Sequence, residues 1–135
     1  MRRSEQRRDA AFAIYQRDVT GRPLAELLAD AKPFTRDLAE GTDAHIEEID
    51  ALISANLRGW TIHRVAPLER AIMRVALFEI NYREEIPVPV SIDEAVSTVK
   101  RYCGTDAPGF VNGVLSAASG EQPRAAVNGG GGEGS

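Results

Sequence analysis

The segment Pro67–Ile80, Pro-Leu-Glu-Arg-Ala-Ile-Met-Arg-Val-Ala-Leu-Phe-Glu-Ile, decides the fold of this chain. Proline suits the first turn of a helix, because the N–H that it lacks has no partner there. The apolar side chains that follow cover most of the circumference of such a helix: Leu68, Ala71, Ile72, Val75, Ala76, Leu77, Phe78 and Ile80. A helix that is apolar nearly all round is a buried one. We therefore expect this helix to lie at the centre of the molecule.

Helical periodicity also dominates the chain before this segment. Ser4 can cap a first helix, and Pro23 is placed to open a second one after a break at Gly21. Pro33 ends the second helix, and a third, long helix is expected from about residue 34 to residue 57. Its acidic positions lie opposite its apolar ones, which predicts a solvated acidic face.

The chain after the central segment continues with helices. Pro87 and Pro89 predict an extended connection, because proline pushes its predecessor out of the helical region. Ser91 and Glu94 then match the capping box Ser-x-x-Glu, which predicts the start of a helix. A last helix is expected over about residues 108–118, and we find no convincing strand. The fold class predicted is all-α, with about six to seven helices.

The length of 135 residues fits one domain or two closely packed halves. We expect residues 1–60 to form an N-terminal helical bundle with a basic N-terminus, and residues 61–119 to form a C-terminal bundle. The Gly-rich segment 120–135 lacks periodicity and is expected to be disordered. The single cysteine, Cys103, excludes an intramolecular disulfide and favours an inert packing residue in a reducing compartment.

The sequence does not match the patterns typical of enzymes or membrane proteins. It contains no phosphate-binding glycine loop, no dinucleotide fingerprint, no zinc-protease motif and no nucleophile elbow. His45 and His63 lack the spacing of metal ligands. No apolar stretch approaches the ~18 residues of a membrane span, and the basic start leads into no signal-peptide pattern. We expect a cytoplasmic protein that is not an enzyme and uses no metal or cofactor.

The charge distribution points to an anionic partner. The net charge is −4, yet the first eight residues carry four arginines against one glutamate. These arginines are Arg2, Arg3, Arg7 and Arg8. Side chains at the start of a helix can reach several phosphates of a nucleic acid, with an affinity that falls as salt rises. A solubilising tail is the alternative explanation of the same pattern.

Two aromatic residues near the loop of residues 104–109 strengthen the case for RNA. Tyr102 lies just before this loop and Phe110 just after it. Aromatic side chains at such positions can stack on unpaired bases, the form in which RNA is mostly recognised by sequence. The alternative is that both rings pack into the core beside the adjoining helices.

Several motifs follow one another in order: Arg8-x-x-Ala11-x-x-x-Tyr15-Gln16-x-Asp18, Ile49-Asp50-x-x-Ile53, Trp60-Thr61-x-x-Arg64, Arg70-Ala71-Ile72-x-Arg74-x-Ala76-x-Phe78-Glu79, Glu94-Ala95-Val96 and Phe110-Val111-Asn112-Gly113-Val114-Leu115. Each motif alone is generic. The ordered set, over about residues 3–115, resembles the NusB family of bacterial transcription antitermination factors. This resemblance implies an all-helical, NusB-like fold of two packed helical bundles.

The resemblance also implies partners and a function. The partners would be the ribosomal protein NusE and single-stranded RNA carrying boxA, an element of nascent ribosomal RNA transcripts. The pair would help to load an antitermination complex onto RNA polymerase. Some relatives resemble homodimers, for which exposed parts of the central helix could serve as the interface.

Family motifs assign roles to particular residues. The RNA face implied by the resemblance comprises Arg2, Arg3, Arg7, Arg8, Tyr102, Asp106 and Phe110. The face for NusE would include Tyr15 and Glu79. Gly109 and Cys103 depart from the family pattern, and both lie beside the expected RNA face.

Two other functions remain as alternatives. The chain could be a protein-binding adaptor for NusE without its own affinity for RNA. It could also be a helical RNA-binding module related to that of RNA cytosine methyltransferases, although its sequence contains no methyl-donor site.

Overall fold

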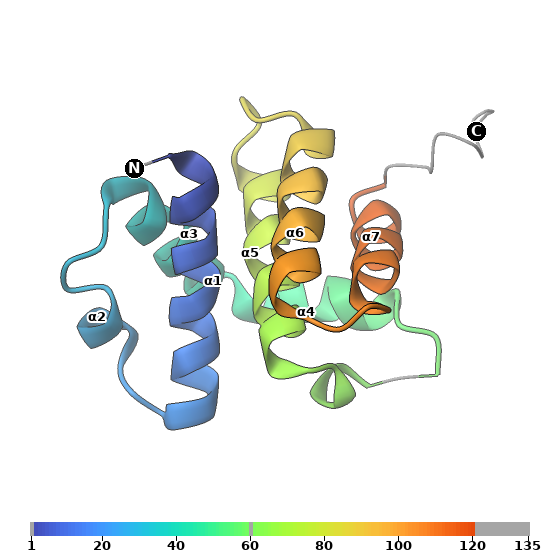
Figure 1. Ribbon diagram of the computed structural model, residues 1–135, viewed down its shortest axis with the longest axis horizontal. Coiled ribbons are helices and arrows are strands. Elements are labelled where there is room, and N and C mark those ends of the chain that lie inside the picture. The colour runs from blue at the N-terminus through green and yellow to red at the C-terminus, as the bar shows by residue number, and fades with distance from the viewer. Residues whose placement is uncertain (1, 60, 121–135) are drawn as a thin grey trace.

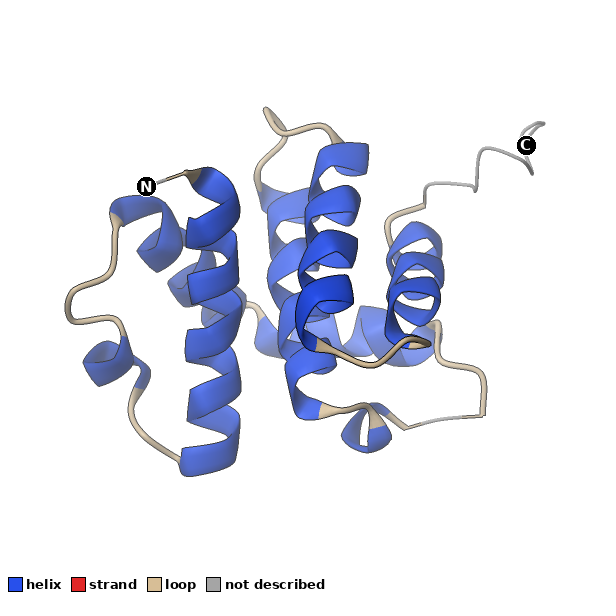
Figure 2. Ribbon diagram, in the orientation of Figure 1, coloured by secondary structure: helices blue, strands red, loops and turns tan. Residues whose placement is uncertain are grey.

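The computed structural model describes residues 2–59 and 61–120, which form seven α-helices, one 3-10 helix and no strand. The all-α prediction is therefore confirmed for this part of the chain (Figure 2). Most of the predicted Gly-rich tail, residues 121–135, lies outside the described residues. The elements in chain order are α1 (Arg3–Thr20), α2 (Leu24–Leu27), α3 (Pro33–Ala44), α4 (Ile46–Ala55), η1 (Ile62–Arg64), α5 (Pro67–Tyr82), α6 (Val88–Tyr102) and α7 (Ala107–Ala118).

Helix α5 is the central helix, as its sequence predicts. Every residue from Ala71 to Glu79 is buried, and α5 contacts α1, α3, α4, α6 and α7 (Figure 1). Buried apolar residues of both expected halves form one continuous hydrophobic core around it. The exposed residues of α5 lie near its ends, at Pro67 and Asn81, and a homodimer through them stays a prediction. The division into two bundles stays a prediction.

The expected long helix over residues 34–57 is wrong, because the chain turns at His45 between α3 and α4. Both pieces pack on α5, and the turn allows each to meet a different part of it. The His45 ring stacks on the Tyr82 ring, with 4.1 Å between the centroids. The Phe78 ring lies so close to Gly41 of α3 that a Cβ there would overlap it. Packing against α5 thus overrides the continuous periodicity of the sequence.

The expected capping box at Ser91 and Glu94 is also wrong. Helix α6 begins at Val88, with Pro87 as its N-cap and Pro89 in its first turn. Neither proline costs a hydrogen bond there, because the first N–H groups of a helix have no acceptor within the helix. Ser91 lies inside the helix, where it is 1% exposed and its Oγ forms no hydrogen bond to another described residue. The side chain of Glu94 lies beside Arg7 instead.

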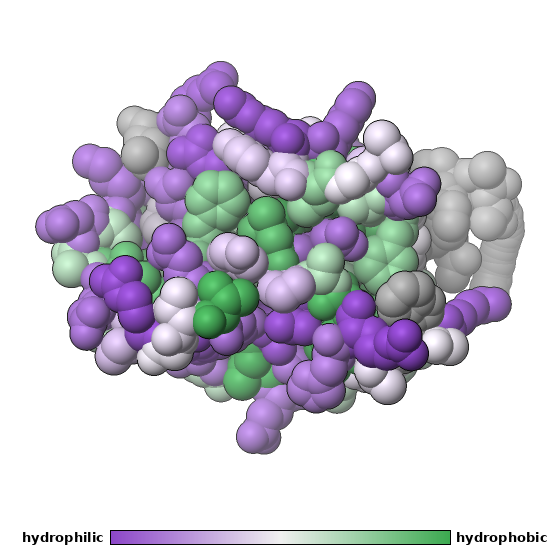
Figure 3. Space-filling model, turned by 60° about the horizontal axis from the view of Figure 1, so that its bottom comes forward, coloured by the Kyte–Doolittle hydropathy of each residue, from purple (hydrophilic) through white to green (hydrophobic). Residues whose placement is uncertain are grey.

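Hydrophobic side chains reach the underside of the molecule in separate patches, with hydrophilic side chains around them (Figure 3). In the described parts of the chain, no helix combines the length and the apolar character that crossing a bilayer requires.

Replacing Ser91 by alanine separates the two accounts of this residue. Loss of an N-cap serine costs about 0.5–2 kcal/mol of stability. Loss of a buried hydroxyl that has no partner leaves the stability of the protein unchanged or raises it by up to about 1 kcal/mol. We therefore expect Ser91→Ala to be at least as stable as the unchanged protein in urea unfolding. A loss of 1 kcal/mol or more would restore the capping role.

Candidate nucleic-acid interface

The first turn of α1 carries two of the expected RNA-binding arginines at its exposed start. Helix α1 begins at Arg3, with Arg2 as the N-cap residue. The backbone N–H of Arg2 donates a hydrogen bond to Oε1 of Glu5 at 3.1 Å. Ser4 therefore lies within the helix and is not its cap, contrary to expectation. The side chains of both arginines are exposed to solvent.

Arg7 and Glu79 contact each other, although we expected them on two different faces. Nε of Arg7 donates to both carboxylate oxygens of Glu79, at 3.0 and 2.9 Å, and Nη2 donates to Oε2 at 2.6 Å. The side chains are only 12% and 1% exposed, respectively. Burial by itself would lower the pKa of Arg7, but the hydrogen bonds and charge of Glu79 raise it above the ordinary value.

This ion pair bears on the roles expected for both residues. Glu79 offers no surface atom to a protein partner, and the guanidinium of Arg7 is occupied by a carboxylate rather than free for phosphate. The Nη1 atom of Arg7 also lies 4.0 Å from Oε1 of Glu94. Arg7 thus joins α1 to both α5 and α6.

Arg8 and Tyr102 lie together on the surface between α1 and α6. Hydrogen bonds to Asp9, at 3.1 Å from Nη2, raise the pKa of Arg8, and Tyr102 adds to this effect. Tyr102 is 40% exposed, and its ring meets the Phe12 ring edge to face, with centroids 5.2 Å apart. The Arg101 guanidinium lies 5.5 Å from the centroid of Tyr102. A ring that is both exposed and held in this way is suited to stacking on a base.

Asp106 and Phe110 share a hollow whose lining does not include Tyr102. They line an open hollow between the loop before α7 and the region of Arg64 and Glu69. Asp106 is exposed, whereas Phe110 is partly buried and packs against the core. Burial raises the pKa of the Glu69 carboxyl in the same hollow. Phe110 therefore packs against the core, as the alternative to RNA stacking expected, while part of its side chain stays accessible to solvent.

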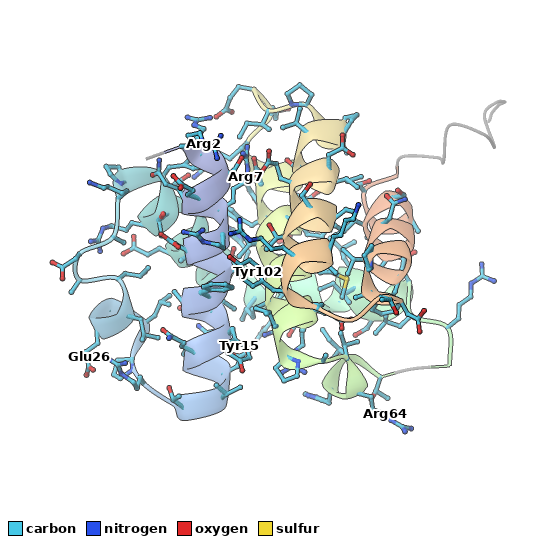
Figure 4. All side chains as sticks on the ribbon, viewed as in Figure 1. Arg2, Arg7, Tyr15, Glu26, Arg64 and Tyr102 are labelled. Atoms are coloured by element: carbon cyan, nitrogen blue, oxygen red, sulfur yellow. The ribbon has the colours of Figure 1, made fainter. Side chains whose placement is uncertain are left out.

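The structure brings together the expected residues of α1 and α6. Figure 4 shows Arg2, Arg7 and Tyr102 following one another along α1 and α6, with Tyr15 further along α1. Tyr15 is partly buried and packs against the core, so only part of it is open to a partner.

Sequence reasoning missed the aromatic and basic residues that support this face: Phe12, Phe34 and Arg101. A signal was present for Arg101, which directly precedes Tyr102. The other two lie on different elements from the side chains that they contact.

Fold and surface together define a helical binding protein with an arginine-rich face suited to an anionic ligand. In the described ranges, no three His, Cys, Asp or Glu side chains are grouped as a metal ion would need.

Comparisons with known proteins agree with this class. The model of the NusB family matches residues 4–119. The transcription antitermination protein NusB of Geobacillus kaustophilus is 45% identical over 122 residues, covering 86% of this chain and 94% of the relative. The solved NusB structure of T. maritima has a TM-score of 0.83 at 26% identity and covers 93% of this chain and 96% of its own.

A further solved structure contains the antitermination factors NusB and NusE in complex with dsRNA. Its matching chain has a TM-score of 0.77 at 31% identity, with 89% of this chain and 98% of that chain covered. The chain therefore belongs to the NusB family of transcription antitermination proteins, which are not enzymes. The family resemblance of the sequence motifs is thereby confirmed.

The Arg7–Glu79 pair should contribute far more to stability than an exposed ion pair. Glu79→Gln would leave the buried Arg7 charge without its partner, at a cost of about 3 kcal/mol. The matched control is Glu26→Gln, which weakens an exposed pair with Arg22 and should cost less than about 0.5 kcal/mol. Urea unfolding of both variants measures the difference. Equal effects would contradict the anchoring role of Glu79.

Proposed function

We propose that this protein binds boxA-type single-stranded RNA together with the ribosomal protein NusE, as a transcription antitermination factor at nascent ribosomal RNA transcripts. The observation that carries the proposal is the surface group of exposed Arg2, Arg3 and Tyr102, with the partly exposed Arg8, along α1 and the end of α6. The relative in complex with NusE and dsRNA supports the choice of partners.

The chemistry of this group suits a single strand of RNA. Arginine side chains give bidentate hydrogen bonds to phosphates, and an exposed aromatic ring can stack on a base. Asp106 and Phe110 extend the proposed face to the hollow before α7, where a carboxylate can accept hydrogen bonds from a base edge. Within this face, we assign Arg7 the role of fixing α1 on α5 rather than of contacting phosphate.

The NusE face is proposed to include the accessible part of Tyr15, with Glu79 acting through the ion pair that positions α1. The proposal extends to an antitermination complex with RNA polymerase in the cytoplasm, where transcripts are made. A homodimer would need a surface other than the buried middle of α5.

Salt titration of RNA binding tests the proposed face. Three phosphate contacts, from Arg2, Arg3 and Arg8, give log K against log[salt] a slope of about −2. Arg3→Ala should reduce the magnitude of this slope by about 0.7. The matched control, Arg22→Ala just beyond the C-terminal end of α1, should leave it unchanged. Fluorescence anisotropy with labelled boxA-type RNA, with and without NusE, measures both the slope and the expected gain in affinity from the partner.

The outcomes of this titration separate the alternatives. Binding that does not depend on salt would overturn the phosphate contacts. Capture of NusE without RNA binding at any salt concentration would favour the adaptor. Methyl transfer from S-adenosylmethionine to the RNA would favour the enzyme-related module.

Tyr102 should contribute to affinity by stacking and not by charge. Tyr102→Ala should weaken RNA binding by about 1–3 kcal/mol, which is roughly 5- to 150-fold in Kd. Tyr102→Phe keeps the ring and should retain most of the affinity. The salt slope should be the same in both variants as in the unchanged protein. A large loss in Tyr102→Phe would show that the hydroxyl, not the ring, is needed.

A further inference from the structure

Phe34, in the first turn of α3, lies beneath two arginines of α1. The guanidinium carbon of Arg3 is 4.2 Å from the centroid of the Phe34 ring, and that of Arg7 is 5.3 Å from it. Both distances are within the ~6 Å over which a cation is attracted to the face of an aromatic ring. One ring therefore holds the two guanidinium groups near each other.

The two arginines differ in how their charges are balanced. Arg7 is neutralised by the buried carboxylate of Glu79. Arg3 is exposed and forms no ion pair with any residue in the ranges 2–59 and 61–120. Because the carboxylate of Glu79 already balances Arg7, the exposed guanidinium of Arg3 is the one of the two that is open to an anion. The arrangement therefore favours an anionic group at Arg3.

The Phe34 ring is fixed by its own surroundings. Pro33 occupies the first position of α3, and the ring of Phe34 packs against the core. The hydroxyl of the buried Thr35 donates to the backbone oxygen of Gln6 at 3.0 Å, which ties the start of α3 to α1. Because the ring is held before any ligand arrives, Arg3 loses part of its rotational freedom in advance. Such preorganisation raises affinity.

We propose that Phe34 is a positioning residue for RNA binding, which holds the Arg3 guanidinium in place for one phosphate of the strand. This inference rests on the proposed function and extends the RNA face from α1 onto the start of α3. A phosphate is favoured over a stacked base at Phe34, because Arg3 already covers the ring. Phe34 thus acts through Arg3 and does not itself contact the ligand.

A double-mutant cycle tests this role. Phe34→Leu should weaken binding of boxA-type RNA roughly 2- to 5-fold, the effect of losing an exposed cation–π contact. In the Arg3→Ala background the same change should have no further effect. Phe34→Tyr keeps the ring and should bind RNA as the unchanged protein does. Thermal unfolding checks each variant, and Phe34→Met replaces Phe34→Leu if the leucine variant does not fold.

Each remaining outcome overturns the inference. An equal loss in the presence and absence of Arg3 would show that Phe34 acts through stability or direct stacking. Unchanged affinity of Phe34→Leu, or an equal loss in Phe34→Tyr, would remove the positioning role while the proposed function stands. Failure of the unchanged protein to bind RNA at any salt concentration, with or without NusE, would reject the proposed function itself and this role with it.

Discussion

The structure depends on the burial of α5, because that helix takes two charged side chains into the core. Arg74 is 8% exposed and Glu79 is 1% exposed. An isolated charge in such a place is strongly unfavourable, so each must meet an opposite charge from another helix. Arg74 donates to Asp50 of α4 at 2.7 and 2.8 Å and to Asp18 of α1 at 2.6 Å. Burial would lower the pKa of Arg74, but these carboxylates raise it.

The same requirement sets the register of α1. Arg7, near its start, pairs with Glu79 near the end of α5, and Asp18, near its end, pairs with Arg74. These contacts fix α1 antiparallel to α5. They turn Arg7 inward, while Arg2 and Arg3 stay exposed at the N-terminal end and Arg8 lies beside Tyr102. The basic cluster therefore serves two purposes, since one arginine anchors the helix and its neighbours remain at the surface.

Acidic residues show the same division between packing and surface. The run over residues 37–50 was expected to be a solvated face, but several of its members link helices. Asp37 pairs with Arg83, Asp43 with Arg17 and Asp50 with Arg74. Pairs that span elements in this way favour one arrangement of helices over its alternatives. This is also why net charge by itself was a poor guide to which charged residues remain available to a ligand.

The sequence by itself determined the all-α class, the central position of α5 and the family. Each of these can be read from neighbouring residues, namely the apolar side chains around one helix and the order of short motifs along the chain. It also assigned the N-terminal arginines and Tyr102 to one RNA-binding face, although it did not show that they are neighbours in space. Only the tertiary structure decided the turn at His45, the start of α6 at Val88 and the inward turn of Arg7. The turn at His45 and the inward turn of Arg7 involve contacts between residues far apart in sequence, such as the 72 positions between Arg7 and Glu79. Local sequence preferences indicate which secondary structure a segment can form. Whether a charged side chain can be buried depends on the oppositely charged partner that packs beside it, and that partner is known only from the tertiary structure.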